Sequence, residues 1–186
     1  MMQKKNNFVR PLSLPILLVT LFLGLHSAVA LVSIQDRLDV NVAYLKSVHD
    51  KAFKDVYKNV WSVELEEKVV ATFDTYIKEW NINSNMVLIT EKENDMLRGW
   101  ALFKINNDQA ILELVCVDPE YCRRGIGKRL VFSILEHYPN ISRIGVVTRK
   151  INTISPEFYP ALGFQKTDFL LPEYNADEIQ GYEWIK

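Results

Sequence analysis

The chain is poor in the residues that mark several large classes of protein. It has two cysteines, Cys116 and Cys122, which are too few for a four-cysteine zinc site or a dense disulfide scaffold. Seven glycines and seven prolines are too few for a fibrous or low-complexity chain. The formal net charge of -1 gives no reason to expect a nucleic-acid partner. We therefore expect neither a metal site nor nucleic-acid binding.

Hydrophobic residues make up 48% of the 186 residues, which suffices for one domain with a real core, but they are unevenly distributed. In the first thirty residues, three basic residues precede an apolar run over 12–25, and the small residues Ala28-Val29-Ala30 follow. This order is typical of a secretory signal peptide, here over 1–30 and cleaved after Ala30. An uncleaved membrane anchor and an apolar core helix are the alternatives.

Cleavage after Ala30 predicts an exported protein, periplasmic or secreted, that consists of residues 31–186. This part has 19 Lys+Arg against 23 Asp+Glu, a net charge of -4, which favours cationic partners only weakly. Contact with a membrane is expected only if the leader stays uncleaved. Both cysteines would meet an oxidising compartment, where a bridge between them is one possibility.

Residues 31–186 show helical and strand-like patterns in a recognisable order. Apolar residues spaced three and four apart predict helices over 36–61, 64–80, 126–137 and 156–162. Runs rich in apolar and β-branched residues predict strands over 86–90, 99–105, 110–117, 144–148, 164–170 and 182–185. Two helices, an antiparallel run and a strand–loop–helix–strand crossover imply a sheet of mixed direction in an α/β (α+β) fold.

The segment 115–128 carries the strongest chemical signal. A strand passes through a short loop into a helix that opens at Gly125-Ile126-Gly127. Free backbone N–H groups at such a helix start, together with the helix dipole, form a binding site for a phosphate group. Four basic residues surround this point and add positive charge: Arg123, Arg124, Lys128 and Arg129.

Two well-known phosphate loops do not fit this segment. A dinucleotide-binding fingerprint needs a third glycine where Leu130 stands, and a Walker loop needs Ser or Thr where Arg129 follows Gly127-Lys128. On the glycines alone, a tight strand-to-helix turn with a solvated basic face is an equally good interpretation.

A longer match lies around these glycines. The string V-C-V-D-P-E-Y-x-R-R-G-I-G-K-R-L over 115–130 resembles the acetyl-CoA-binding motif of the GNAT family of N-acetyltransferases. Downstream, 152–164 is similar to the family signature N-x-x-[AS]-x-x-[FL]-Y-x-x-L-G-F. One position departs from the pattern, because Cys122 stands where the family has Gln or Arg. The loop binds mainly through backbone N–H groups, so this change need not abolish binding.

The resemblance implies a single GNAT-like domain over 31–186, with a mixed, mostly antiparallel sheet flanked by helices. It also implies an enzyme that moves an acetyl group from acetyl-CoA to a primary amine of a small molecule or peptide. The transfer would be direct, in a ternary complex and without a metal. An exported acyl-CoA-binding or interaction protein that keeps the fold without turnover is the alternative, because acetyl-CoA is an intracellular metabolite.

By the same resemblance, Tyr159 donates a proton to the departing thiolate, although a packed tyrosine is the alternative. Asn152 binds the pantetheine arm or caps the short helix that follows it. The residues expected at the cofactor are Val115, Val117, Arg123, Arg124, Gly125, Ile126, Gly127, Lys128 and Asn152.

Glu113 is the candidate general base. Even spacing places Glu113, Val115 and Val117 on one face of the strand, where a carboxylate can take the proton of an amine. A charged residue at a strand edge is an equally good interpretation. His49 is expected at the surface, because it follows Val48 of the apolar stripe by one position.

Overall fold

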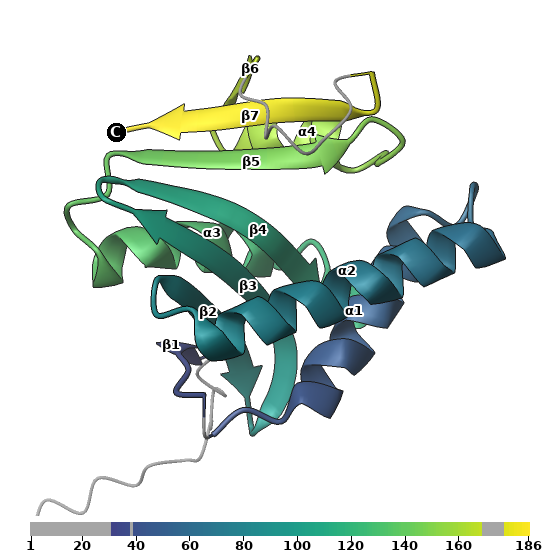
Figure 1. Ribbon diagram of the computed structural model, residues 1–186, viewed down its shortest axis with the longest axis horizontal. Coiled ribbons are helices and arrows are strands. Elements are labelled where there is room, and N and C mark those ends of the chain that lie inside the picture. The colour runs from purple at the N-terminus through teal and green to yellow at the C-terminus, as the bar shows by residue number, and fades with distance from the viewer. Residues whose placement is uncertain (1–30, 38, 169–176) are drawn as a thin grey trace, which may run out of the picture.

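The computed structural model describes residues 31–37, 39–168 and 177–186 (Figure 1). The predicted signal peptide over 1–30 lies outside the described residues and stays a prediction. None of the helices in the described ranges is long and apolar enough to cross a membrane.

A seven-stranded sheet with the order β1-β2-β3-β4-β5-β7-β6 forms the centre of the described structure. Only the central pair, β4 and β5, is parallel, and every other neighbouring pair is antiparallel. The strands are β1 (Leu31–Ile34), β2 (Met86–Glu93), β3 (Met96–Asn106), β4 (Gln109–Val117), β5 (Arg143–Arg149), β6 (Gln165–Thr167) and β7 (Ile179–Ile185). The mixed, mostly antiparallel sheet predicted from the sequence is therefore confirmed.

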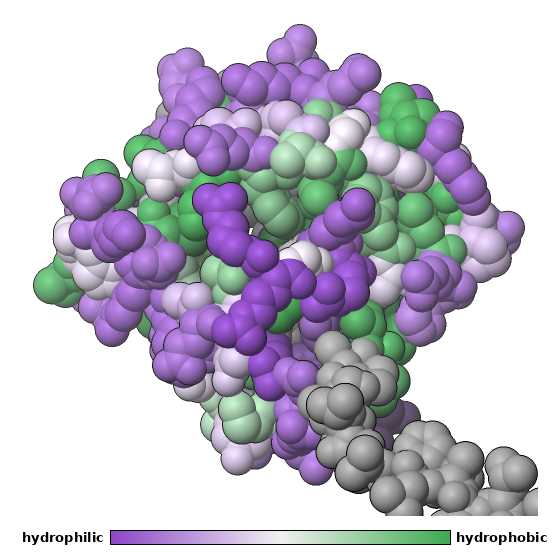
Figure 2. Space-filling model, turned by 180° about the vertical axis from the view of Figure 1, so that it is seen from behind, coloured by the Kyte–Doolittle hydropathy of each residue, from purple (hydrophilic) through white to green (hydrophobic). Residues whose placement is uncertain are grey.

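Helices cover both faces of the sheet (Figure 1). α1 (Val42–Val56) and α2 (Val63–Ile82) lie on one face, and α3 (Ile126–His137) lies on the other. A 3₁₀ turn, η1 (Pro119–Tyr121), joins β4 to α3, and α4 (Ser155–Ala161) follows β5. Seen from the α3 side, strongly hydrophilic residues cross the middle of the surface, with hydrophobic residues visible beside them (Figure 2).

Local signals explain where the two N-terminal helices begin. The side chain of Asn41 accepts a hydrogen bond from the N–H of Ala43, and that of Ser62 accepts one from Leu65. Both are strong N-cap residues. The helix predicted over 36–61 is therefore too long at both ends, because Asn41 caps its start and Tyr57 its end. The prediction is too long because the apolar residues continue at helical spacing beyond these caps.

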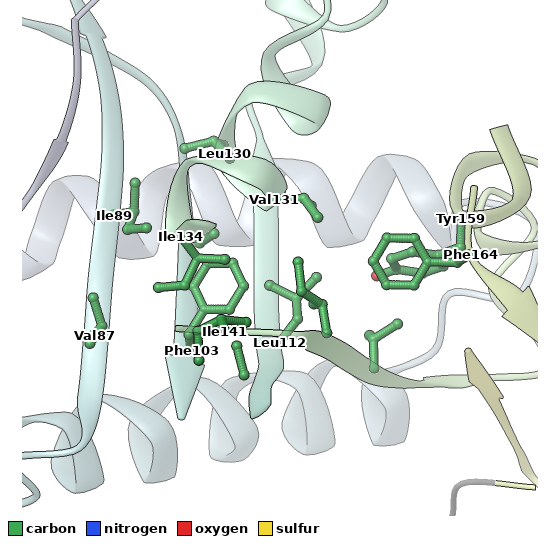
Figure 3. Packing of buried hydrophobic residues seen from close by; sticks show 14 of the residues in the cluster. Val87, Ile89, Phe103, Leu112, Leu130, Val131, Ile134, Ile141, Tyr159 and Phe164 are labelled. Carbon is green, nitrogen blue, oxygen red and sulfur yellow. The ribbon is translucent and has the colours of Figure 1, made fainter. Parts of the chain in front are cut away.

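The core has two layers, one on each face of the sheet. On the α3 face, Leu130, Val131 and Ile134 pack against strand residues such as Phe103 and Leu112 (Figure 3). On the other face, residues of α1 and α2 pack against the opposite side chains of the same strands: Leu45, Phe73, Trp80, Trp100, Leu102, Leu114 and Cys116 belong to this cluster. This packing holds the N-terminus of α3 against the end of β4.

One strand escapes the prediction, and two other predictions need correction. β1 was not predicted, because four residues are too few to show a pattern. The last strands differ in extent, since β6 ends at Thr167 and β7 begins at Ile179, while 169–170 lie outside the described residues. The surface position expected for His49 is wrong. His49 is fully buried, and its ring stacks on Phe53 with a centroid distance of 4.3 Å.

The close approach of β3 to α3 and β4 depends on Gly99. A Cβ at this position would lie 2.8 Å from the carbonyl oxygen of Cys116 and 3.1 Å from side-chain atoms of Ile126 and Leu130. We expect Gly99→Ala to lower the free energy of unfolding by about 1–3 kcal/mol in urea denaturation, since overpacking forces the backbone to shift. Met96→Ala, at an exposed position of the same strand, is the control. Equal stability of the two variants would contradict this packing.

The buried His49 predicts a pH-dependent stability. Burial lowers the pKa of His49 from its ordinary value of 6.5, and its Nε2 has no partner among the described residues. The unfolded chain therefore takes up this proton first, so stability should fall as pH drops below 6.5, by at most about 1.4 kcal/mol per pH unit. Urea denaturation between pH 7.5 and 5 should show a smaller fall for His49→Phe than for the wild type. His137→Gln, at an exposed position, should keep the wild-type slope.

Candidate functional site

The central parallel strands separate after a short stretch of pairing. β4 pairs with β5 over four positions, from Gln109↔Arg143 to Leu112↔Val146. Beyond them, β4 stays paired with β3 as far as Val117, and β5 stays paired with β7 as far as Arg149. Among the described residues, the backbone groups of β4 that face β5 after Leu112 thus lack a sheet partner (Figure 1).

A cleft of about 830 Å³ fills the space between the separated strands. Its walls come from the C-terminal part of α1, from α2, from the end of β4, from the loop that opens α3, and from β5 and α4. The structure brings nearly all of the predicted site residues to this cleft: Glu113, Val115, Val117, Arg123, Gly125, Ile126, Gly127, Lys128, Asn152 and Tyr159 line it. Arg124 does not.

The loop that opens α3 presents backbone N–H groups to the cleft. Its N-cap, Gly125, has a left-handed backbone (φ 76°) and offers no side-chain acceptor. The first backbone bond at this end runs from the N–H of Arg129 to the carbonyl of Gly125 (3.1 Å). The N–H groups of Ile126, Gly127 and Lys128 precede that bond and have no acceptor within the helix. Together with the helix dipole they form a site for an anion.

The loop is connected to α1 by a buried carboxylate. Asp118 accepts hydrogen bonds from Lys51 Nζ of α1 (2.8 Å) and from the N–H of Glu120 (3.1 Å). The hydrogen bond and charge of Asp118 raise the pKa of Lys51. Sequence reasoning missed this pair, because the two residues are 67 positions apart.

Two of the four basic side chains at the loop are held by contacts within the protein. Arg124 donates to the carbonyl of Glu120 (3.3 Å) and lies over the ring of Tyr121, 5.2 Å from its centroid. Arg129 is bound to the buried carboxylate of Glu91. Arg123 and Lys128 are exposed on the cleft wall, so they are the basic side chains best placed to meet an anion.

Glu113 occupies a β-bulge of β4. Leu112 pairs with Phe103 and Leu114 pairs with Leu102, so Glu113 is the extra residue that β4 inserts at this point of the register. The bulge interrupts the alternation of side chains, and even spacing therefore does not settle the face of Glu113. The structure places it on the cleft wall, partly buried. A carboxylate at this position can take a proton from a ligand in the cleft.

Tyr159 lies on α4 and lines the cleft. Its ring packs against that of Phe164, with a centroid distance of 5.5 Å (Figure 3). The rings of Tyr182 and Phe158 also pack against it, with centroid distances of 5.2 and 5.1 Å. Burial raises the pKa of Tyr159, and nearby Cys116, Tyr57 and Tyr182 raise it further. The phenol therefore keeps its proton at neutral pH.

Asn152 performs the capping role that was one of its two predicted roles. Its Oδ1 accepts hydrogen bonds from the N–H groups of Ile154 (2.9 Å) and Ser155 (3.0 Å) at the start of α4. Its side chain also hydrogen-bonds Tyr57, the C-cap of α1, whose pKa burial raises. Tyr57 lines the cleft, and the sequence gives no local signal of this bond across 95 positions.

The two cysteines are free thiols rather than a bridge. Cys116 is buried in the cluster beneath α1 and α2, whereas Cys122 is exposed in the loop before α3. Burial raises the pKa of both thiols, so neither environment favours a thiolate nucleophile. The described ranges of the chain also contain no group of three or more His, Cys, Asp and Glu side chains that could hold a metal ion.

Comparisons with known proteins agree with this geometry. The PaiA N-acetyltransferase of Thermoplasma acidophilum, solved with coenzyme A, is 19% identical with a TM-score of 0.66, over 83% of this chain and 99% of that one. The ribosomal-protein-S18-alanine N-acetyltransferase of Escherichia coli is also 19% identical, with a TM-score of 0.58, over 84% of this chain and 94% of that one. Likeness at this level of identity shows a shared fold.

Sequence comparisons match parts of the chain to a curated protein and to a protein family. The UPF0157 protein YqkA of Bacillus subtilis (strain 168) is 30% identical over 77 residues, which are 41% of this chain. The match spans 22% of that relative, about a fifth of its length. Residues 50–164 match the Acetyltransferase (GNAT) family, and they include the bulge of β4, the glycine loop and Tyr159. The chain belongs to the Acetyltransferase (GNAT) family.

Proposed function

We propose that the protein is an N-acyltransferase that moves an acetyl group from acetyl-CoA to a primary amine by direct transfer in a ternary complex. One observation carries this proposal. Unpaired backbone of β4, the uncapped N-terminus of α3 and the protonated phenol of Tyr159 all meet at one cleft. An acyl donor with a phosphate end and an amide-containing arm needs such a combination.

The glycine loop fits the diphosphate of coenzyme A. The N–H groups of Ile126, Gly127 and Lys128 have no helical acceptor, and anions bind well at such helix starts. Gly127 has no room for a side chain, since a Cβ there would lie 3.0 Å from the ring of Phe158. Arg123 and Lys128 add charge at the mouth of the cleft.

The free edge of β4 fits the amide-containing pantetheine arm. An extended chain with amide groups can pair with an open strand edge as an additional strand would. Beyond the bulge, Val115 and Val117 line the cleft with their backbone on the side that β5 has left. Val115 and Val117 therefore contribute mainly backbone groups to donor binding.

Acyl transfer requires a proton acceptor, a group that stabilises the oxyanion and a proton donor. The cleft contains a candidate for each. Glu113 accepts the proton of the attacking amine, directly or through water. A backbone N–H of β4 beyond the bulge stabilises the negative charge that develops on the carbonyl oxygen. Tyr159 donates its proton to the sulfur that leaves. Glu113 and Tyr159 come from β4 and α4, and both line the cleft.

The acceptor enters between α1, α2 and the ends of the separated strands. Phe53, Tyr57 and Tyr76 line this part of the cleft, and they suit the apolar part of a small-molecule or peptide amine. A screen of amines that monitors release of the CoA thiol distinguishes an enzyme from a binding protein without turnover. Binding of acetyl-CoA without thiol release for any amine would favour the binding protein.

Tyr159→Phe tests the proton donor. We expect turnover to fall by roughly 10²-fold or more, because the variant keeps the ring packing but has no proton to give. The dissociation constant for acetyl-CoA, measured by isothermal titration calorimetry, should change by less than about twofold, since the donor-binding backbone is intact. Tyr182→Phe, whose ring packs on Tyr159, is the matched control and should keep both values. Turnover near the wild-type level would remove Tyr159 from the mechanism.

Gly125→Ala tests the glycine loop. Position 125 has a φ of 76°, and a Cβ there would lie 3.2 Å from an Arg129 nitrogen. We expect CoA to bind about tenfold more weakly, a loss of about 1.4 kcal/mol. Gly163→Ala is the matched control, because Gly163 also has a positive φ (89°) but does not line the cleft. It should lose stability and keep its affinity for CoA. Equal affinity losses in both variants would point to general strain instead.

A further inference from the structure

A fully buried carboxylate lies beneath the first turn of α3. Glu91 belongs to β2 and continues the row of Val87 and Ile89, which face α3 in the core. It has no exposed surface. Buried acidic side chains are rare unless they are paired. An apolar side chain would suit this row better, so the presence of Glu91 calls for a reason.

Its partner is Arg129, in the first turn of α3. The guanidinium binds Glu91 through two nitrogens, Nε to Oε2 at 3.1 Å and a terminal nitrogen to Oε1 at 2.5 Å. This forked arrangement fixes the plane of the guanidinium as well as its distance. The hydrogen bond from Arg129 to Glu91 also raises the pKa of Arg129.

The remaining nitrogen of Arg129 connects this pair to the glycine loop. It donates to the carbonyl of Arg124 at 3.1 Å, and Arg124 directly precedes the N-cap Gly125. The same nitrogen lies 3.2 Å from the place where a Cβ of residue 125 would be. Glycine at 125 therefore permits both the left-handed turn and the approach of the guanidinium.

The pair does not serve the loop as a source of charge, because Glu91 neutralises Arg129. Burial of an ion pair is also a weak source of stability, since apolar side chains of similar volume often stabilise a protein equally well or better. The role that remains for the pair is to orient the glycine loop. A rigid chain of contacts runs from β2 through Glu91 and Arg129 to the Arg124 carbonyl, at the turn that contains the positive φ angles of Arg123 and Gly125.

We propose that Glu91 and Arg129 are positioning residues that hold the 123–125 turn so that the first N–H groups of α3 point into the cleft. The proposal assigns them a role in binding the phosphate end of the donor, and it rests on the proposed function for that donor. Neither side chain needs to touch the donor itself.

An acyl donor without phosphates distinguishes the positioning role from a purely structural one. We expect Glu91→Gln and Arg129→Lys to lower kcat/KM for acetyl-CoA by about tenfold, mainly through KM. For S-acetylpantetheine, which lacks the diphosphate, kcat/KM should change by less than about twofold, since the loop binds no part of it. Glu183→Gln, which breaks the Arg143–Glu183 pair between β7 and β5, is the control and should change neither value. Equal losses for the two donors, or no loss for acetyl-CoA, would overturn the proposal.

A measurement on the ligand-free protein separates this proposal from the proposed function. Backbone ¹⁵N order parameters at 123–127 should fall from about 0.85, typical of rigid backbone, to about 0.6 or below in Glu91→Gln and Arg129→Lys. Those of residues 130–135 should stay unchanged, which shows that α3 is still folded. If wild-type protein binds no CoA, the proposed function fails while the order parameters still decide the positioning role. Unchanged order parameters at 123–127 would refute it.

Discussion

The separation of β4 from β5 is the constraint on which the rest of the site depends. Pairing between these parallel strands ends at Leu112 and Val146, while each strand remains held by its other neighbour. An unpaired strand edge inside a protein is unfavourable unless something satisfies its N–H and C=O groups. The bulge at Glu113 lies where the separation begins, and bulges bend strands and increase their twist. The fold thus leaves open backbone groups where an extended ligand can pair with them.

The glycine loop is held by α1 on one side and by the sheet on the other, rather than by its own sequence. Lys51 of α1 binds Asp118 before η1, and Glu91 of β2 binds Arg129 after the glycines. Between these two anchors, the N–H groups of Ile126, Gly127 and Lys128 can remain without a helical acceptor, because both anchors bind through side chains. An anion site formed by backbone donors needs this rigidity, since donors that are already oriented lose little freedom when the anion binds.

Local patterns predicted much of this structure, and distant contacts account for the remainder. α3 has the predicted bounds, since Gly125 marks its start and its apolar residues keep a helical period. Nearly all of the predicted site residues line one cleft, because most of them are close together in the sequence and include the glycine that forms the turn. Burial of His49 depends on aromatic residues contributed by α1, α2 and β3, which no helical period reveals. The bulge at Glu113 is likewise a property of two strands, and the partner of Arg129 lies 38 residues away.

In the proposed transfer, burial shifts the pKa of the phenol that would give the proton and that of the thiol that would receive it in the same direction. A low dielectric disfavours the charged forms of phenols and thiols alike, so both become weaker acids. Burial raises the pKa of the Tyr159 phenol, and it raises the pKa of the Cys116 thiol as well. In the proposed reaction, a departing thiolate shielded from water by the protein is by the same reasoning a stronger base than it is in water. In the proposed mechanism, the raised pKa of Tyr159 keeps its proton in place before the reaction, and the greater basicity of a shielded thiolate acts against the weaker acidity of the phenol.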